Sequence, residues 1–296
     1  MNFLWVVFTV VAAAGQTARN AMQRELTQSL GAVGATHVRF LFGFPFALLF
    51  LLGVAVFTGA ALPHPTSAFW FWIVSGALTQ IGGTALMLLT MTERSFVVTV
   101  AYLKTEPLFV AALGLLFLHD PLTPGMALAI VIATAGVVLI SLRSGAESGG
   151  LRPALLGLAA GGLFAISAIG YRGGILALHA PGYLMPATFA LATGLVVQAF
   201  VLTLYLAFTS PKVLRAIVRL WRPSLFAGFM GSAASEFWFL AFALATAASV
   251  RTLGLIDVLF AQLVSHILFK QKTTAREAAG IVLLVAGAVL LVYSHP

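Results

Sequence analysis

The chain has 296 residues, of which 61% are hydrophobic and only 8% are charged, and its mean hydropathy is +1.06. In an average soluble domain about a quarter of the residues are charged, so this composition excludes a soluble enzyme and a disordered chain. It also excludes an outer-membrane barrel, whose strands alternate in polarity. A helical protein with several membrane spans remains. Cysteine is absent, which excludes disulfides, zinc–thiolate sites and thiol catalysis.

The formal net charge is +8. The basic residues lie mainly at the ends of apolar runs, so we expect anionic lipid head groups, and not nucleic acid, as their partners. The first five residues lack a basic segment, which predicts that the first apolar run is a structural span and not a cleaved signal peptide.

Apolar runs separated by polar, proline or glycine residues predict ten membrane-spanning helices. Each crossing takes about 20 residues, so the connections are short and leave no room for a soluble domain. Ten helices can enclose a cavity without a second copy of the chain. The expected spans are 3–22, 35–57, 67–91, 96–118 and 123–142 in the first half, and 154–171, 184–208, 225–245, 249–269 and 275–293 in the second.

The order and spacing of the first five expected spans repeat in the last five, which divides the chain into two halves, 1–145 and 146–296, and suggests a duplication. Residues 95–140 align with 246–291 without a gap, and this alignment places Glu106 on Asp257. Five spans per half is an odd number, so the two halves enter the membrane from opposite sides. The predicted fold is an all-α membrane protein with two inverted-topology five-helix repeats, typical of secondary transporters.

The Lys and Arg residues of short loops predict the orientation of a membrane protein. The connections on one side carry eleven of them, and those on the other side carry two, Arg172 and Arg251. The eleven are Arg24, Arg94, Arg143, Arg152, Lys212, Arg215, Arg219, Arg222, Lys270, Lys272 and Arg276. This bias predicts a multi-pass protein of a bacterial-type inner (plasma) membrane with both termini outside the cytoplasm.

Five charged residues lie well inside the expected spans: Arg39, Lys104, Glu106, Glu236 and Asp257. A charge at the centre of the bilayer costs about 2.5–3.5 kcal/mol even on the lenient insertion scale, so unpaired and lipid-facing positions are excluded for all five. We expect them to face one another or a hydrated cavity.

Lys104, Glu106 and Pro107 lie together in the fourth span. Because proline lacks an N–H group, it removes a helical hydrogen bond, which predicts a bend and a hinge at Pro107. Broken helices near the middle of the membrane are typical of transporter sites. Residues two positions apart on a helix point about 200° apart, so Lys104 and Glu106 need separate partners.

Glu236 and Asp257 have two open interpretations. A carboxylate in a dry site favours its protonated form, which suits proton coupling. A neighbouring cation such as Lys104 favours the charged form and gives a structural ion pair instead.

Other polar and aromatic residues accompany these charges. Gln80, Tyr102 and Trp238 are candidates to line a substrate pocket. Arg39 either binds an anionic group with its planar guanidinium or extends toward the membrane interface. Arg19 lies near the end of its span, and there we expect it to extend toward the interface.

The two signs of charge inside the spans favour a small polar or zwitterionic, amino-acid-like substrate for a secondary transporter. One alternative is proton-coupled efflux of hydrophobic or quaternary cations through Glu106, Glu236 or Asp257. Another is a membrane scaffold or lipid-handling protein that transports nothing. The sequence has no metal cluster, phosphate loop or nucleophile motif, so we expect neither catalysis nor a cofactor.

The pattern resembles the EamA-type branch of the drug/metabolite transporter superfamily. The resemblance rests on the break and closing run at 119–125 and 135–140, on their second copy at 270–274 and 286–291, and on Thr105-Glu106-Pro107. It implies a carrier with a central cavity that opens alternately to each side and often moves metabolites outward. It also implies termini in the cytoplasm, the reverse of the orientation that the Lys and Arg count predicts.

Overall fold

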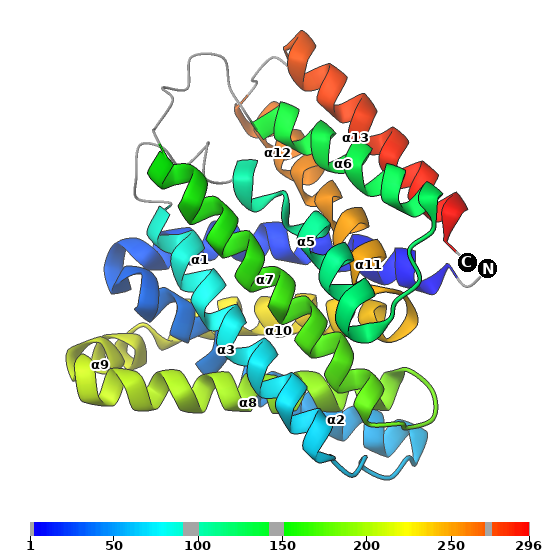
Figure 1. Ribbon diagram of the computed structural model, residues 1–296. Coiled ribbons are helices and arrows are strands. Elements are labelled where there is room, and N and C mark those ends of the chain that lie inside the picture. The colour runs from blue at the N-terminus through cyan, green and yellow to red at the C-terminus, as the bar shows by residue number, and fades with distance from the viewer. Residues whose placement is uncertain (1–2, 91–100, 142–150, 270–273, 296) are drawn as a thin grey trace.

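A computed structural model describes residues 3–90, 101–141, 151–269 and 274–295, and nearly all of these residues are helical (Figure 1). Within them, eight helical stretches are long and apolar enough to cross a membrane. The chain is therefore an all-α, multi-pass membrane protein. Of the basic residues counted above, Arg94, Arg143, Lys270 and Lys272 lie outside the described residues.

The first helix is longer than the hydropathy pattern predicts. α1 covers Leu4–Leu41, and α2 covers Phe44–Thr58. The helical path is interrupted at Gly31, whose φ of 70° and ψ of 173° suit glycine alone. The expected polar gap at 23–34 is thus helical on both sides of Gly31, because its Arg, Glu, Leu and Gln residues are good helix formers.

The predicted break in the fourth span is confirmed. α3 covers Ser67–Thr90, and residues 101–103 are helical before a turn at Lys104 and Thr105. α5 then begins at Glu106 and ends at Leu113, with Pro107 in its first turn, where proline needs no N–H partner. A π-helical turn follows at Gly114–Leu118, and α6 covers Pro124–Ser141.

The second half contains a similar interruption. α7 covers Leu151–Ala177, α8 covers Leu184–Thr209, α9 covers Pro211–Arg219 and α10 covers Trp221–Leu244. α11 (Ala247–Leu253) passes through a 3-10 turn at Gly254–Ile256 into α12, Asp257–Phe269. α13 covers Ala275–Ser294, and its capping box joins Thr274 and Glu277.

Three pairs of helices pack most extensively: α3 with α7, α1 with α10, and α6 with α13. The last pair lies side by side at one edge of the molecule in Figure 1. Small residues allow these approaches. A β-carbon on Gly170 of α7 would lie 2.7 Å from the Cα of Gly76 on α3, and one on Gly136 of α6 would lie 2.6 Å from the backbone nitrogen of Leu284 on α13.

The two chain ends meet at one end of the bundle. Trp5 stacks on His295 with 4.9 Å between ring centroids, and Figure 1 shows the termini next to each other. At the opposite end, Ile217 of α9 is fully buried in a cluster with Leu30, Val38 and Leu88. The exposed basic residues of α9 belong to this second end.

The positions of Arg172 and Arg251 correct the sequence analysis. Both were counted as loop residues of the less basic side, yet Arg172 lies in α7 and Arg251 in α11. Each makes an ion pair inside the bundle. Neither residue therefore counts as a loop residue of the less basic side.

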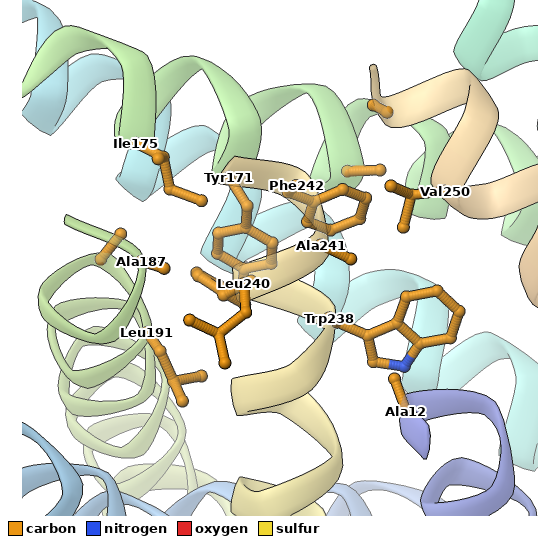
Figure 2. Packing of buried hydrophobic residues seen from close by; sticks show 14 of the residues in the cluster. Ala12, Tyr171, Ile175, Ala187, Leu191, Trp238, Leu240, Ala241, Phe242 and Val250 are labelled. Atoms are coloured by element: carbon orange, nitrogen blue, oxygen red, sulfur yellow. The ribbon is translucent and has the colours of Figure 1, made fainter. Parts of the chain in front are cut away.

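Aromatic side chains fill the middle of the bundle, where α7 and α10 meet (Figure 2). Tyr171 packs against Phe239 with 4.6 Å between ring centroids. Trp238 and Phe242 stack at 6.3 Å. This core fixes one wall of the cavity described next.

Candidate functional site: a central cavity

A small, partly open cavity lies between helices from both halves of the chain, and the roughly 370 Å³ of empty space at this place includes the region outside its opening. α1 and α3 from the first half and α7, α10 and α11 from the second supply its walls. The lining residues are Gln16, Arg39, Gln80, Phe164, Ser167, Ala168, Tyr171, Ser235, Trp238, Phe239, Phe242 and Arg251.

Two helices present the same spacing of residues to the cavity. α7 contributes positions 164, 167, 168 and 171, and α10 contributes 235, 238, 239 and 242. Residues three and four apart share one face of a helix, so each helix turns a single stripe toward the cavity. Both stripes combine aromatic rings with a hydroxyl group, which makes the lining amphipathic.

A hydrogen-bonded group of neutral residues forms one polar part of the lining. The Tyr171 hydroxyl donates to Oε1 of Gln80 over 2.8 Å, and Nε2 of Gln198 donates to the same oxygen over 2.9 Å. Nε2 of Gln198 also donates to the Tyr171 hydroxyl over 3.0 Å. The group joins α3, α7 and α8, and it fixes the orientation of the Gln80 and Tyr171 side chains.

Arg39 lines the cavity and does not extend to the interface. Only 5% of the residue is exposed, and its Nη1 donates to the Thr84 hydroxyl over 3.5 Å. Its Nε is buried without a hydrogen-bond partner among the described residues. Arg19 is 4% exposed, so the expectation that it extends to the interface is wrong. Its Nη2 donates to Oδ1 of Asn20 over 3.0 Å.

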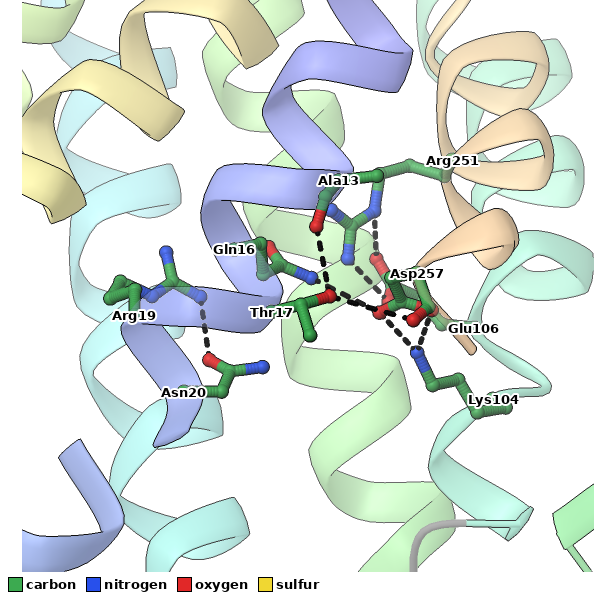
Figure 3. Close-up of polar contacts among 9 residues, drawn as sticks. All are labelled: Ala13, Gln16, Thr17, Arg19, Asn20, Lys104, Glu106, Arg251 and Asp257. Atoms are coloured by element: carbon green, nitrogen blue, oxygen red, sulfur yellow. Dashed lines mark hydrogen bonds and ion pairs between the residues drawn. The ribbon is translucent and has the colours of Figure 1, made fainter. Parts of the chain in front are cut away.

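Two ion pairs connect the halves of the chain beside the cavity (Figure 3). Nζ of Lys104 lies 2.6 Å from Oδ2 of Asp257. Arg251 holds both oxygens of Glu106, with Nε–Oε1 and Nη2–Oε2 distances of 2.6 Å. Lys104 and Glu106 thus have separate partners, as their spacing predicts. Arg251 also lies over the Trp238 ring, 4.9 Å from its centroid.

Both acids of these ion pairs occupy the same place in their halves. Glu106 is the first residue of α5, and Asp257 is the first residue of α12. Each follows an interruption of the helical path. The N-terminal end of a helix carries a partial positive charge, which stabilises an acidic residue at this position. Gln16, a lining residue, also donates to Oδ2 of Asp257 over 3.5 Å, so the pairs are in contact with the cavity.

The remaining predicted residues lie apart from the cavity lining. Glu236 accepts a hydrogen bond from the Thr188 hydroxyl of α8, and its Oε2 is buried without a partner among the described residues. Tyr102 is 38% exposed and is not part of the lining. Pro107 is buried at the start of α5. The structure therefore gathers Arg39, Gln80 and Trp238 around one space.

The sequence analysis missed several residues. Tyr171 lies at the border of an expected span, but α7 continues to Ala177 and places it in the core. Arg172 holds Asp120, with an Nη2–Oδ1 distance of 2.9 Å, and donates to the carbonyl oxygens of Phe242 and Ala245. A cation at the edge of an apolar run was the available signal for both Arg172 and Arg251, and it does not separate an interfacial residue from a buried one.

Comparisons with known proteins agree with this architecture. A solved structure described as "Crystal structure of protein" has a TM-score of 0.69 with 14% sequence identity, and the similarity covers 96% of this chain and 95% of that chain. At this identity the likeness shows the fold alone. None of the curated proteins compared with the sequence matches it. Residues 3–142 match the EamA-like transporter family. Residues 3–142, nearly half of the chain, thus belong to the EamA-like transporter family, a family of membrane transporters and not of enzymes.

Proposed function

We propose that the protein is a secondary transporter that carries a small polar metabolite with a carboxylate group, of the amino-acid-like class, out of the cell by alternating access. The observation that carries this proposal is the cavity between the halves, whose lining combines Arg39, Gln80 and aromatic rings. A single buried arginine can bind a carboxylate through two parallel hydrogen bonds. Apolar and aromatic groups around a few polar ones are typical of small-molecule sites.

The proposed fold is the ten-helix inverted repeat, with repeats at 1–145 and 146–296. Three observations support it. The family match ends at residue 142, close to the expected boundary. Glu106 and Asp257 begin helices after a break in both halves. In the proposed repeats, α3 and α10 are the third spans, and α1 and α7 are the first spans. The third span of each repeat thus packs on the first span of the other, α3 on α7 and α10 on α1.

In this proposal, the ion pairs hold the broken helices in the observed state. Lys104 with Asp257 and Glu106 with Arg251 join the two halves beside the cavity. Pro107 keeps the helix at this break from becoming continuous, so the break can act as a hinge. A change of state that displaces α5 relative to α11 and α12 therefore changes at least one of these pairs.

Proton coupling is the favoured energy source, because Glu236 has a buried oxygen without a partner among the described residues. Glu236→Gln is expected to keep the Thr188 contact and to abolish the response of transport to a pH gradient. Cation efflux is less well supported, because no acidic residue lines the cavity among those described.

The proposed location is a bacterial-type inner membrane with the basic end of the bundle in the cytoplasm and both termini outside. Reporter fusions to the C-terminus test this orientation. We expect the alkaline phosphatase fusion to be active and the fluorescent-protein fusion to be non-fluorescent. The opposite pattern contradicts this orientation.

The transport function itself is tested with the purified chain in lipid vesicles. We expect uptake of at least one labelled carboxylate metabolite from a panel, and a decrease for Tyr171→Phe and Gln80→Leu. Tyr205→Phe is the matched control, because Tyr205 is an exposed tyrosine of α8 outside the lining. If protein-containing and protein-free vesicles take up all compounds equally, the proposal fails.

A further inference from the structure

Two buried arginines lie side by side next to the cavity. A β-carbon on Gly231 of α10 would lie 3.4 Å from Cγ of Arg39 and 3.5 Å from Cδ of Arg19, so both side chains pack against the same glycine. Each residue is at least nine-tenths buried. Arg39 comes from the end of α1 after the Gly31 break, and Arg19 comes from the part of α1 before it.

Neither arginine makes an ion pair with an acidic residue among the described residues. The acids near the cavity are already engaged, Glu106 with Arg251 and Asp257 with Lys104. Asp120 is engaged by Arg172 at another place. Glu236 bonds to Thr188 on α8 and not to either arginine. Two like charges buried together are unfavourable unless an anion compensates them.

The unpartnered buried hydrogen-bonding atoms around the cavity are mainly donors. Nε of Arg39, Nε of Arg19 and the indole nitrogen of Trp238 are all buried without a hydrogen-bond partner among the described residues. Buried polar groups normally have a partner, and the partner that donors need is an acceptor. A carboxylate offers acceptor oxygens only.

We propose that Arg19 and Arg39 form an anion-binding subsite and that the transported metabolite carries a net negative charge, with a dicarboxylate preferred over a zwitterion of similar size. This inference rests on the proposed transport function. One carboxylate lies at the arginine pair. The described lining has no acidic residue that could bind an ammonium group, so a zwitterion leaves its positive charge without a partner. The hydroxyl and amide groups of Tyr171, Gln80 and Ser235 bind the second polar end.

The test uses vesicles with the purified chain and three probes with similar carbon skeletons. Glutarate carries two negative charges, glutamate carries one net negative charge, and 4-aminobutyrate is a zwitterion. We expect uptake to decrease in that order, with glutarate exceeding 4-aminobutyrate roughly tenfold, because one charge-assisted hydrogen bond is worth about that factor. If 4-aminobutyrate is carried as well as glutarate, the inference is wrong while the transport function stands. If none of the three nor any compound of the wider panel is carried, the transport function fails first.

Variants assign the preference to the two arginines. Arg39→Gln and Arg19→Gln are expected to reduce glutarate uptake roughly tenfold or more and to lower the ratio of glutarate uptake to 4-aminobutyrate uptake at least about threefold, because the variant site no longer favours a net negative charge. Arg39→Lys keeps the charge and is expected to recover part of the glutarate uptake. Arg215→Gln is the control, because Arg215 is an exposed arginine of α9.

A binding measurement covers the case in which a variant does not fold. Glutarate is expected to raise the melting temperature of the unmodified protein in detergent, and 4-aminobutyrate is expected to leave it unchanged. Equal effects of the two compounds, or equal losses of both uptake activities in a well-folded Arg39→Gln variant, contradict an anion subsite.

Discussion

Removal of the charge on Glu106 is the sharpest test of the ion pairs between the halves. In Glu106→Gln, Arg251 loses a carboxylate that it holds through two bonds of 2.6 Å. Both side chains are largely buried, so the change leaves a charge in the bundle without its partner. Breaking a buried pair from one side typically costs about 3–5 kcal/mol. The glutamine oxygen can still accept one bond, so we expect a loss of about 3 kcal/mol in the free energy of unfolding.

This loss is large enough to measure in detergent. A domain of this size has a total stability of about 5–15 kcal/mol, and 1 kcal/mol shifts its melting temperature by about 2–4 °C. Glu106→Gln is therefore expected to melt about 6–12 °C lower. The assay follows the decrease of the monodisperse peak in size-exclusion chromatography after heating. Arg215→Gln, on the exposed face of α9, is the control and is expected to shift melting by about 1–2 °C at most.

The double variant Glu106→Gln/Arg251→Met separates pairing from general damage. It leaves no charge without a partner, so we expect it to recover at least half of the loss in melting temperature. The methionine side chain still packs against Trp238, which Arg251 contacts in the structure. The reasoning is refuted if Glu106→Gln melts within 2 °C of the unmodified protein, or if the double variant melts as low as the two single losses combined.

Two further predictions concern stability. Gly170→Ala is expected to lower the free energy of unfolding by about 1–3 kcal/mol, because its methyl group would lie 2.7 Å from the Cα of Gly76. The control Gly162→Ala in the same helix meets no atom within 4 Å and is expected to be neutral or stabilising. Equal melting temperatures of the two variants contradict the close packing of α3 on α7. Asp120→Asn is expected to lower the free energy of unfolding by about 3 kcal/mol, because it removes the charge partner of Arg172. In the control His119→Asn, asparagine tolerates the φ of 54° at this position, so the variant should melt within about 2 °C of the unmodified protein. Similar melting temperatures of the two variants argue against a buried pair.

Much of the fold is encoded locally, and those parts are predictable from the sequence. Pro107 removes a helical hydrogen bond wherever it occurs inside an apolar run, so the break before α5 follows from one residue. The length of α1 does not follow in this way. A hydropathy pattern detects the apolar segment that crosses the bilayer and not the end of the helix. The helix continues through the polar residues 23–30, because those residues also form helices readily. Gly31 interrupts the regular path with a φ of 70° and a ψ of 173°, and a glycine in the sequence does not by itself show that the chain adopts this conformation there.

The site is predictable in its residue types but not in its directions. The burial cost of charges identifies Glu236 as an interior residue. On α10, however, positions 235, 238, 239 and 242 face the cavity, and position 236 is rotated by about 100° from 235, which turns it toward Thr188 on α8. Arg251 begins an apolar run like an interfacial anchor, and only its proximity to Glu106 reveals its role.

The exchange of partners between α1 and α10 and between α3 and α7 has a consequence for the moving parts of the transporter. Each of these pairs joins one helix from either half, so neither half can tilt as a unit without separating its closest neighbours. Under the proposed alternating access, the bodies that rock against each other therefore contain helices of both halves. A chain cut between residues 142 and 150 and produced as two fragments should still assemble in the bilayer through these shared surfaces.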